Sequence, residues 1–226
     1  NMAMCANYIP SKLDAISQHH GLERALFNFP DEAFPGYLAP IIRESHVVNG
    51  EIECVPAMFG MVPHWGDAKL ARQTYNARTE SVATKPSFRN AWKRNQFCIV
   101  PAESVFEPNY ESGKPVRWRI EHADGKPLGI AGIWEWKSSG PDGLPLLSFS
   151  MLTINADEHA LMRRFHKPGE EKRMLVMLEP HQYLDWMQGS LVNDEAVYQP
   201  YPAERLVAQT DPMPPRGKAK TADLFA

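Results

Sequence analysis

The order of apolar and polar positions along the chain predicts many short strands and few helices. Segments 45–48 and 51–55 flank Asn49-Gly50, the dipeptide most typical of a tight β-hairpin. Alternating patterns rich in β-branched and aromatic residues mark further strands, which we expect at 96–100, 116–121, 128–136, 146–154 and 174–178. The chain is therefore expected to build mainly β-sheet.

Helical periodicity is restricted to three segments. An apolar stripe predicts a helix over 11–28 with Ser11 as its N-cap. Segments 155–165 and 180–187 are interpreted as helices too, whereas 29–40, with three prolines and one glycine, is interpreted as a loop. Strand–helix–strand alternation is rare, which disfavours a doubly wound parallel sheet. We therefore expect an α+β fold with a curved, mostly antiparallel sheet or barrel-like core and flanking helices.

The length of 226 residues is enough for one domain with a substantial core. We expect this domain to span 1–210, with 1–3 as a tag or leader. The end, 211–226, is rich in proline and lysine and poor in apolar residues, so we expect a flexible tail there.

Composition narrows the class of protein. Hydrophobic residues make up 43% and charged residues 23% of the chain, as in ordinary globular proteins. No run of 18 apolar residues and no secretory signal is visible, so we expect a cytoplasmic protein without a membrane partner. The three cysteines, Cys5, Cys54 and Cys98, lack paired spacing, which argues against a disulfide framework. No ligand spacing implies a metal or organic cofactor, and we expect a monomer.

The distribution of charge is more informative than the net charge of −3. Segment 64–96 contains seven basic residues, Arg78 and Arg89 among them, against two acidic ones. A local basic surface binds phosphates even on a mildly acidic protein. The alternative is ordinary solvated charge on helices and loops.

The start of the chain holds a candidate nucleophile. Removal of Met4 as an initiator methionine would leave Cys5 as the N-terminal residue, with an α-amine and a thiol on adjacent carbons. An aldehyde that forms an imine with this amine is attacked by the thiol, which closes a five-membered thiazolidine. An internal cysteine has no free α-amine, so the chain starting at Asn1 is not expected to form this ring.

Seven further motifs follow in a fixed order. They are Ala39-Pro40; Phe59-Gly60-Met61-Val62-Pro63-His64-Trp65; Asn76-Ala77-Arg78-Thr79-Glu80-Ser81; Cys98-Ile99-Val100-Pro101-Ala102-Glu103 leading to Phe106-Glu107; Ala131-Gly132-Ile133-Trp134-Glu135-Trp136; Phe149-Ser150-Met151-Leu152-Thr153-Ile154-Asn155-Ala156; and His166 preceding Arg173-Met174. In this order and spacing, over roughly residues 4–200, the chain resembles the SRAP family. Members of that family sense abasic sites in single-stranded DNA.

The resemblance implies a set of catalytic residues. It makes Cys5 the nucleophile that bonds the ring-opened aldehyde as a thiazolidine DNA–protein crosslink. Glu107 matches the catalytic glutamate of the family, and its apolar neighbours are expected to raise its pKa. His166 matches a second proton-transfer residue, and Asn76 matches an amide that holds the nucleophile or a sugar oxygen.

The resemblance also implies a DNA-binding surface. Arg78 would contact a phosphate, with Glu80 as its orienting partner, and Trp65 would stack on a base unless it packs in the core. Pro40 and Arg89 complete the predicted DNA-binding set. The predicted partner is single-stranded DNA that contains an abasic site.

The chain departs from the family in the segment after His166. The family typically has His-Asp-Arg-Met-Pro, whereas this chain reads His166-Lys167-Pro168-Gly169-Glu170-Glu171-Lys172-Arg173-Met174. Two other functions stay open: an autoproteolytic cysteine peptidase that removes its own leader, and a non-catalytic module that binds single-stranded DNA.

Overall fold

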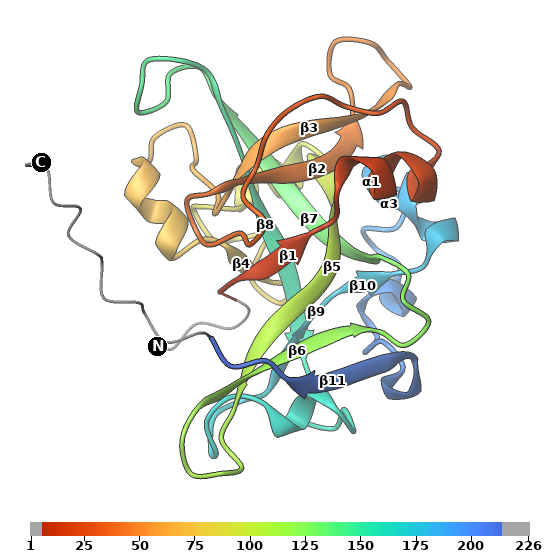
Figure 1. Ribbon diagram of the computed structural model, residues 1–226. Helices are drawn as coiled ribbons and strands as arrows, with labels where there is room; N and C mark the ends of the chain where they lie inside the picture. Colours follow the sequence, from red (N-terminus) through yellow and green to blue (C-terminus); the bar gives the residue numbers. More distant parts are fainter. Residues whose placement is uncertain (1–5, 214–226) are drawn as a thin grey trace, which may run out of the picture.

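The computed structural model describes residues 6–213 and confirms an α+β fold (Figure 1). Its single sheet has eleven strands: β1 Tyr8–Pro10, β2 Leu38–Glu44, β3 Ile52–Phe59, β4 Asn76–Arg78, β5 Phe97–Asn109, β6 Val116–His122, β7 Leu128–Lys137, β8 Leu146–Asn155, β9 Arg173–Leu175, β10 Met177–Leu178 and β11 Leu206–Thr210. The α-helices in the described residues are short: α1 Leu13–His20, α2 Arg89–Lys93 and α3 Tyr183–Met187. None of them is long and apolar enough to cross a membrane.

Five strands close on themselves to form a barrel. The hydrogen-bonded order is β7–β8–β3–β2–β5, and β5 then pairs with β7. All pairs of this ring are antiparallel except β3 with β8. Phe59 of β3 and Phe149 of β8 stack with ring centroids 5.3 Å apart, and both are fully buried. Closure pairs the strand edges and encloses this apolar core.

Strand β5 is the longest strand and extends beyond the barrel. Its first half pairs with β7, and its second half pairs with β6 and β1. The sequence pattern predicts this strand only over 96–100. The structure continues the strand through Pro101 to Asn109, which places Glu107 inside the sheet.

Two predicted helices differ from the structure. The helix expected over 11–28 covers only Leu13–His20, because Gly21 takes a φ of +65° and ends it. The segment 155–165 holds only a single 3₁₀ turn, Met162–Arg164. There the ring Nδ1 of His159 accepts hydrogen bonds from the backbone N–H groups of Leu161 and Met162, which diverts them from helical partners.

Other boundaries moved by a few residues. The N-cap of α1 is Lys12, whereas the N–H of Ser11 donates to the carbonyl of Pro101 at 3.1 Å. The predicted strand 45–48 lies in the hairpin loop, and β2 instead begins at Leu38 within the predicted loop 29–40. Asp211, where we expected a tail to begin, accepts a hydrogen bond from Nε of Arg119 at 2.8 Å.

The turn after β3 depends on a glycine in close contact. Gly60 has a φ of +108°, and a Cβ placed on it would lie 2.3 Å from the carbonyl oxygen of Ala71. Its N–H donates to the carbonyl of Phe149 at 2.9 Å, which ties the turn to β8. The path of the chain from β3 to β4 therefore tolerates no side chain at this position.

We expect Gly60→Ala to destabilise the fold by about 1–3 kcal/mol more than Gly36→Ala. Gly36 has a similar φ of +95° but open space around its Cα, so it reports the backbone cost alone. Urea denaturation of both variants measures the difference. Equal losses of stability in the two variants would show that Ala71 moves aside at no cost in free energy.

Candidate functional site

Two predicted catalytic residues, Glu107 and His166, are in direct contact. Glu107 lies on β5 with 2% of its surface exposed, and its Oε2 is 3.1 Å from Nε2 of His166. His166 follows the 3₁₀ turn Met162–Arg164 and is also buried. The sequence separates these residues by 59 positions, and the fold brings them together as an acid–base pair.

The backbone holds the histidine in place. His166 has a φ of +65°, which few residues other than glycine adopt. Its N–H donates to the carbonyl of Pro108 at 2.8 Å, and the neighbouring Phe165 forms a β-bridge with Asn109. The ring is therefore positioned against β5 by main-chain contacts on both of these residues.

The pair is suited to carry a proton near neutral pH. Burial would lower the pKa of His166, but the negative charge of Glu107 and the hydrogen bond to it outweigh that effect, so the pKa is raised from its ordinary 6.5. A buried imidazolium beside a carboxylate holds a proton that either group passes to a substrate.

Hollows open on two sides of the pair. Glu107 lines one of about 590 Å³ together with Ala6, Asn7, Phe106 and Arg117. His166 lines another of about 580 Å³, with Tyr110, Arg163, Arg164 and Lys172 among its walls. Cys5 lies outside the described residues, but Ala6, the next residue in the chain, lines the first hollow.

The two cysteines in the described part of the chain are poor nucleophiles. Cys98 is fully buried and Cys54 is half-buried. Burial raises the pKa of the Cys54 thiol to about 12 and raises that of Cys98 as well. Since the thiolate is the reactive form, neither competes at neutral pH with a thiol at the N-terminus.

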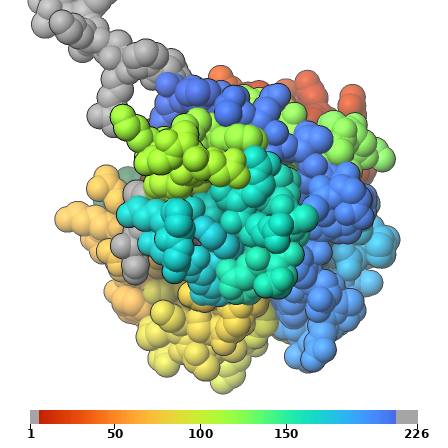
Figure 2. Space-filling view, turned by 90° about the horizontal axis from the view of Figure 1, so that it is seen from below, coloured from red at the N-terminus to blue at the C-terminus, as the bar shows by residue number. Residues whose placement is uncertain are grey.

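Asn76 and Arg78 lie on β4, which pairs in parallel with β8. Asn76 is half-buried opposite Met151, and Arg78 is exposed opposite Thr153. Their strand was missed in the sequence because it has only three residues. Figure 2 shows the face on which the predicted basic segment 64–96 (orange to yellow) borders the segment around 155–175 (cyan).

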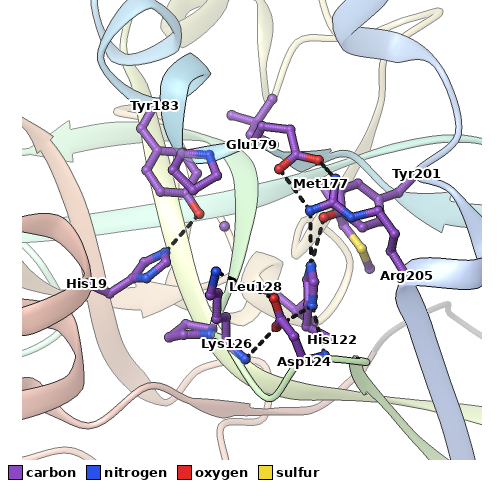
Figure 3. A pocket seen from close by; sticks show the side chains of 14 residues that line it. His19, His122, Asp124, Lys126, Leu128, Met177, Glu179, Tyr183, Tyr201 and Arg205 are labelled. Atoms are coloured by element: carbon purple, nitrogen blue, oxygen red, sulfur yellow. Dashed lines mark hydrogen bonds and ion pairs between the residues drawn. The ribbon is translucent and has the colours of Figure 1, made fainter.

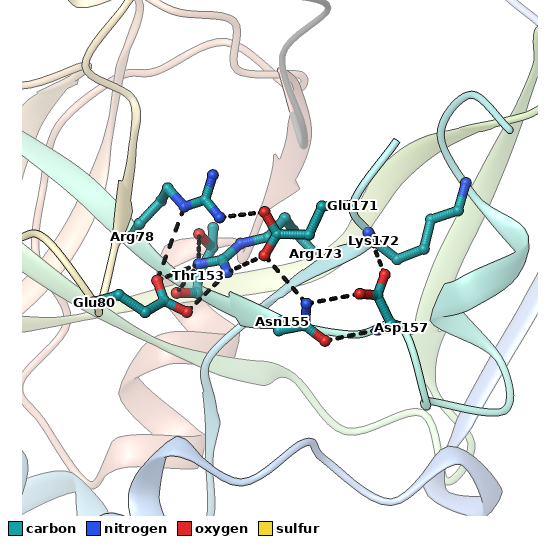
Figure 4. A network of polar contacts seen from close by, with 8 residues as sticks. All are labelled: Arg78, Glu80, Thr153, Asn155, Asp157, Glu171, Lys172 and Arg173. Atoms are coloured by element: carbon teal, nitrogen blue, oxygen red, sulfur yellow. Dashed lines mark hydrogen bonds and ion pairs between the residues drawn. The ribbon is translucent and has the colours of Figure 1, made fainter. Parts of the chain in front are cut away.

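A network of charges joins β4 to β9 (Figure 4). Glu80 accepts two hydrogen bonds from the guanidinium of Arg173, both at 2.8 Å, whereas it is 3.9 Å from Nε of Arg78. The expected pairing of Glu80 with Arg78 is therefore secondary. Arg78 instead donates to Glu171, a residue of the segment in which this chain departs from the family pattern.

The remaining predicted DNA-binding residues have different environments. Trp65 is 54% exposed, which argues against the alternative of core packing, and it lines a hollow of about 520 Å³ with Lys69 and Lys137. Arg89 is exposed at the start of α2. Pro40 is buried in β2 opposite Pro56, so it offers almost no surface to a DNA strand.

A smaller cavity of about 110 Å³ contains none of the predicted site residues (Figure 3). Its cations face acids: Arg205 pairs with Glu179, and Lys126 pairs with Asp124, which the ring of His122 also contacts. The hydroxyl of Tyr201 is 2.9 Å from Nε2 of His122. These charges cancel, and we assign the cavity a structural role. Within residues 6–213, no group of three or more His, Cys, Asp and Glu is arranged to hold a metal ion.

The raised pKa of His166 makes stability depend on pH. The pair with Glu107 stabilises the fold below the ordinary pKa of 6.5, and this contribution is lost as the pH rises through the raised value. We expect His166→Gln to lose more stability, relative to the unchanged chain, at about pH 6 than at about pH 9. Urea denaturation at both values measures this, with the exposed His181→Gln as the control. Equal losses at the two pH values would contradict it.

Comparisons with known proteins place the chain among related sequences. Abasic site processing protein YoqW of Bacillus subtilis (strain 168) is 29% identical over 155 residues, which is 66% of this chain and 65% of that protein. This chain thus spans less than two thirds of the length of the curated relatives it matches.

Solved structures share the fold over almost the whole chain. The crystal structure of a protein from Bordetella bronchiseptica is 35% identical with a TM-score of 0.81, and the match covers 92% of this chain and 100% of that one. A protein from Bacteroides thetaiotaomicron, 22% identical with 91% of each chain covered, has a TM-score of 0.75 and shows the shared fold alone. The family model described as SOS response associated peptidase (SRAP) matches residues 4–210, and this chain belongs to the SRAP family.

Proposed function

We propose that this protein processes abasic sites in single-stranded DNA and bonds them covalently through Cys5 as the N-terminal residue. The observation that carries the proposal is the contact of Glu107 with His166 beside a hollow lined by Ala6. The name of the relative YoqW, abasic site processing protein, supports the same substrate. The covalent step is inferred from the chemistry of a terminal cysteine.

The proposed reaction joins one aldehyde to two groups of Cys5. The α-amine adds to C1′ of the ring-opened sugar and gives a carbinolamine, which loses water to form an imine. The thiol sulfur then adds to the imine carbon, and its proton passes to the nitrogen. One C–N and one C–S bond form and one water leaves, so no oxidant, reductant or metal is required.

Three of these steps need proton transfer. Opening of the sugar hemiacetal, loss of water from the carbinolamine and addition of the thiol each move a proton. Glu107 lines the same hollow as Ala6 and acts as the group that exchanges protons with the substrate. His166, whose pKa the charge of Glu107 raises, supplies a proton to this carboxylate and takes it back.

The strand is bound by the surface that borders the pair. Arg78 and Arg89 supply exposed guanidinium groups for phosphates, and Trp65 supplies an exposed ring on which a base stacks. Asn76, half-buried on the strand of Arg78, provides an amide for a sugar oxygen. Such contacts recognise the backbone and the stack rather than a particular sequence.

Covalent bonding is tested with single-stranded DNA that holds one abasic site. We expect protein beginning at Cys5 to give a shifted band that survives heat and denaturant, and the chain beginning at Asn1 to give none, because its Cys5 lacks a free amine. Denaturing electrophoresis reads out both. Cys5→Ser retains the amine but not the thiol and should give only a labile imine. A stable band with Cys5→Ser would refute ring closure. If every form bound the DNA without a covalent bond, the protein would instead be a non-catalytic DNA-binding module.

The acid–base role is tested on protein that begins at Cys5. We expect Glu107→Gln to slow crosslink formation by about 10²–10⁴-fold, the usual contribution of a positioned acid–base group. Glu103→Gln is the matched control, since Glu103 lies exposed on the same strand. Rates come from the growth of the shifted band with time. An unchanged rate in Glu107→Gln would remove Glu107 from the mechanism.

A further inference from the structure

Glu171 lies where an anionic ligand of Arg78 would lie. Its Oε2 accepts a hydrogen bond from Nη2 of Arg78, and its Oε1 accepts one from Nη1 of Arg173 at 2.9 Å (Figure 4). Nδ2 of Asn155 donates to the same Oε1 at 3.1 Å. Two guanidinium groups and an amide around one anion form the arrangement in which proteins also hold phosphate.

The side chains of the two arginines differ in exposure and in the number of contacts that fix them. The side chain of Arg173 is 4% exposed, and it is fixed by Glu80 and by the carbonyl of Thr153 at 2.9 Å. The side chain of Arg78 is 52% exposed and faces solvent. Arg173 is therefore an anchor that fixes Glu171, whereas Arg78 is the group that an external anion can reach.

Its surroundings hold the carboxylate of Glu171 in the charged form. Partial burial would raise its pKa, but hydrogen bonds from Arg78, Asn155 and Arg173 lower the pKa to about 2. Its contact with Arg78 is therefore released by a competing anion rather than by a proton.

We propose that Glu171 is an internal competitor of DNA, which holds Arg78 in the free protein and is displaced by a phosphate of the bound strand. The proposal rests on the proposed function, in which Arg78 contacts that strand. Arg78 has an anionic partner before and after the exchange. The exchange therefore changes the free energy little, because a solvent-exposed ion pair contributes little stability. Glu171 keeps its hydrogen bonds from Arg173 and Asn155 when Arg78 turns to the phosphate, so the exchange requires no movement of the backbone.

The consequence is selectivity for damaged strands. Competition by Glu171 weakens every non-covalent encounter, including those with undamaged single strands. A strand with an abasic site is retained by its bond to Cys5 and is not limited by this competition. The carboxylate therefore lowers unproductive binding with no penalty for the final crosslinked state.

The test is fluorescence anisotropy with the full chain and an undamaged, labelled oligothymidylate of about 15 nucleotides. We expect E171Q to bind about two- to fivefold more tightly, the range that corresponds to loss of one exposed ion pair. We also expect its dependence of log K on log salt to steepen by up to about 0.7, because in the unchanged chain the carboxylate that leaves Arg78 attracts cations and offsets the counterions released by one phosphate.

Two controls separate competition from bulk charge. E170Q removes the same charge from the adjacent position, where the carboxylate forms no ion pair within the described residues, and should give little gain. E171Q combined with R78Q should give no gain in DNA affinity over R78Q alone. A gain equal to that of E170Q, a gain that persists in R78Q, or no gain at all would overturn the proposal.

A second readout keeps this proposal distinct from the proposed function. The same variants, beginning at Cys5, are incubated with an oligonucleotide that holds one abasic site and are separated on a denaturing gel. A gain in anisotropy without any crosslink would refute the covalent reaction but support competition by Glu171. A normal crosslink without a gain would refute competition alone, and absence of DNA binding by every variant would contradict both.

Discussion

The pairing of β5 with its neighbours is the constraint on which the rest of the structure depends. Its first half closes the barrel against β7, and its second half pairs with β6. Because side chains alternate between the two faces of a strand, a slip by one residue would exchange the faces of Phe106 and Glu107. The ring of Phe106 lies 3.9 Å beneath the guanidinium of Arg117, so such a slip would also break this contact. The closure of the barrel thus sets the direction of the Glu107 carboxylate.

The histidine opposite is held by equally local means. His166 adopts a backbone conformation that is costly for a residue with a side chain. The cost is offset by hydrogen bonds to neighbouring β5 residues: its own N–H bonds to Pro108, and Nδ2 of Asn109 donates to the carbonyl of Arg164 at 3.0 Å. A site organised in this way before substrate arrives needs little rearrangement during the reaction. The strain and its compensation lie within a few residues of each other.

The sequence predicted the parts of the fold that depend on local pattern. Alternation identified β6, β7 and β8, the start of β5 and the second strand of the hairpin around Asn49-Gly50, and the class of fold followed from them. The motif order brought Glu107 and His166 together as candidates, which the structure places in contact. The failures have physical causes outside local pattern. The helix expected at 155–165 is lost to the side chain of His159, and β4 owes its existence to pairing with β8 rather than to its own residues.

The predicted pairing of Arg78 with Glu80 was wrong for a different reason. Glu80, two residues away, was the natural expectation, but the structure gives Glu80 to Arg173, 93 positions later in the chain. No local signal distinguishes one acidic neighbour from another, because ion pairs follow from the packing of strands. Arg173 itself stood in the last of the sequence motifs, yet its burial became evident only from the sheet.

The segment between His166 and Arg173 has an implication for how such proteins diverge. Each end is secured independently, the first by the main chain of Pro108 and the second by Glu80 and Thr153. Insertions or deletions between these two fixed points leave the acid–base pair and the barrel where they are. If the proposed function holds, changes in the length and charge of this segment alter the affinity for DNA and leave Glu107 and His166 unchanged.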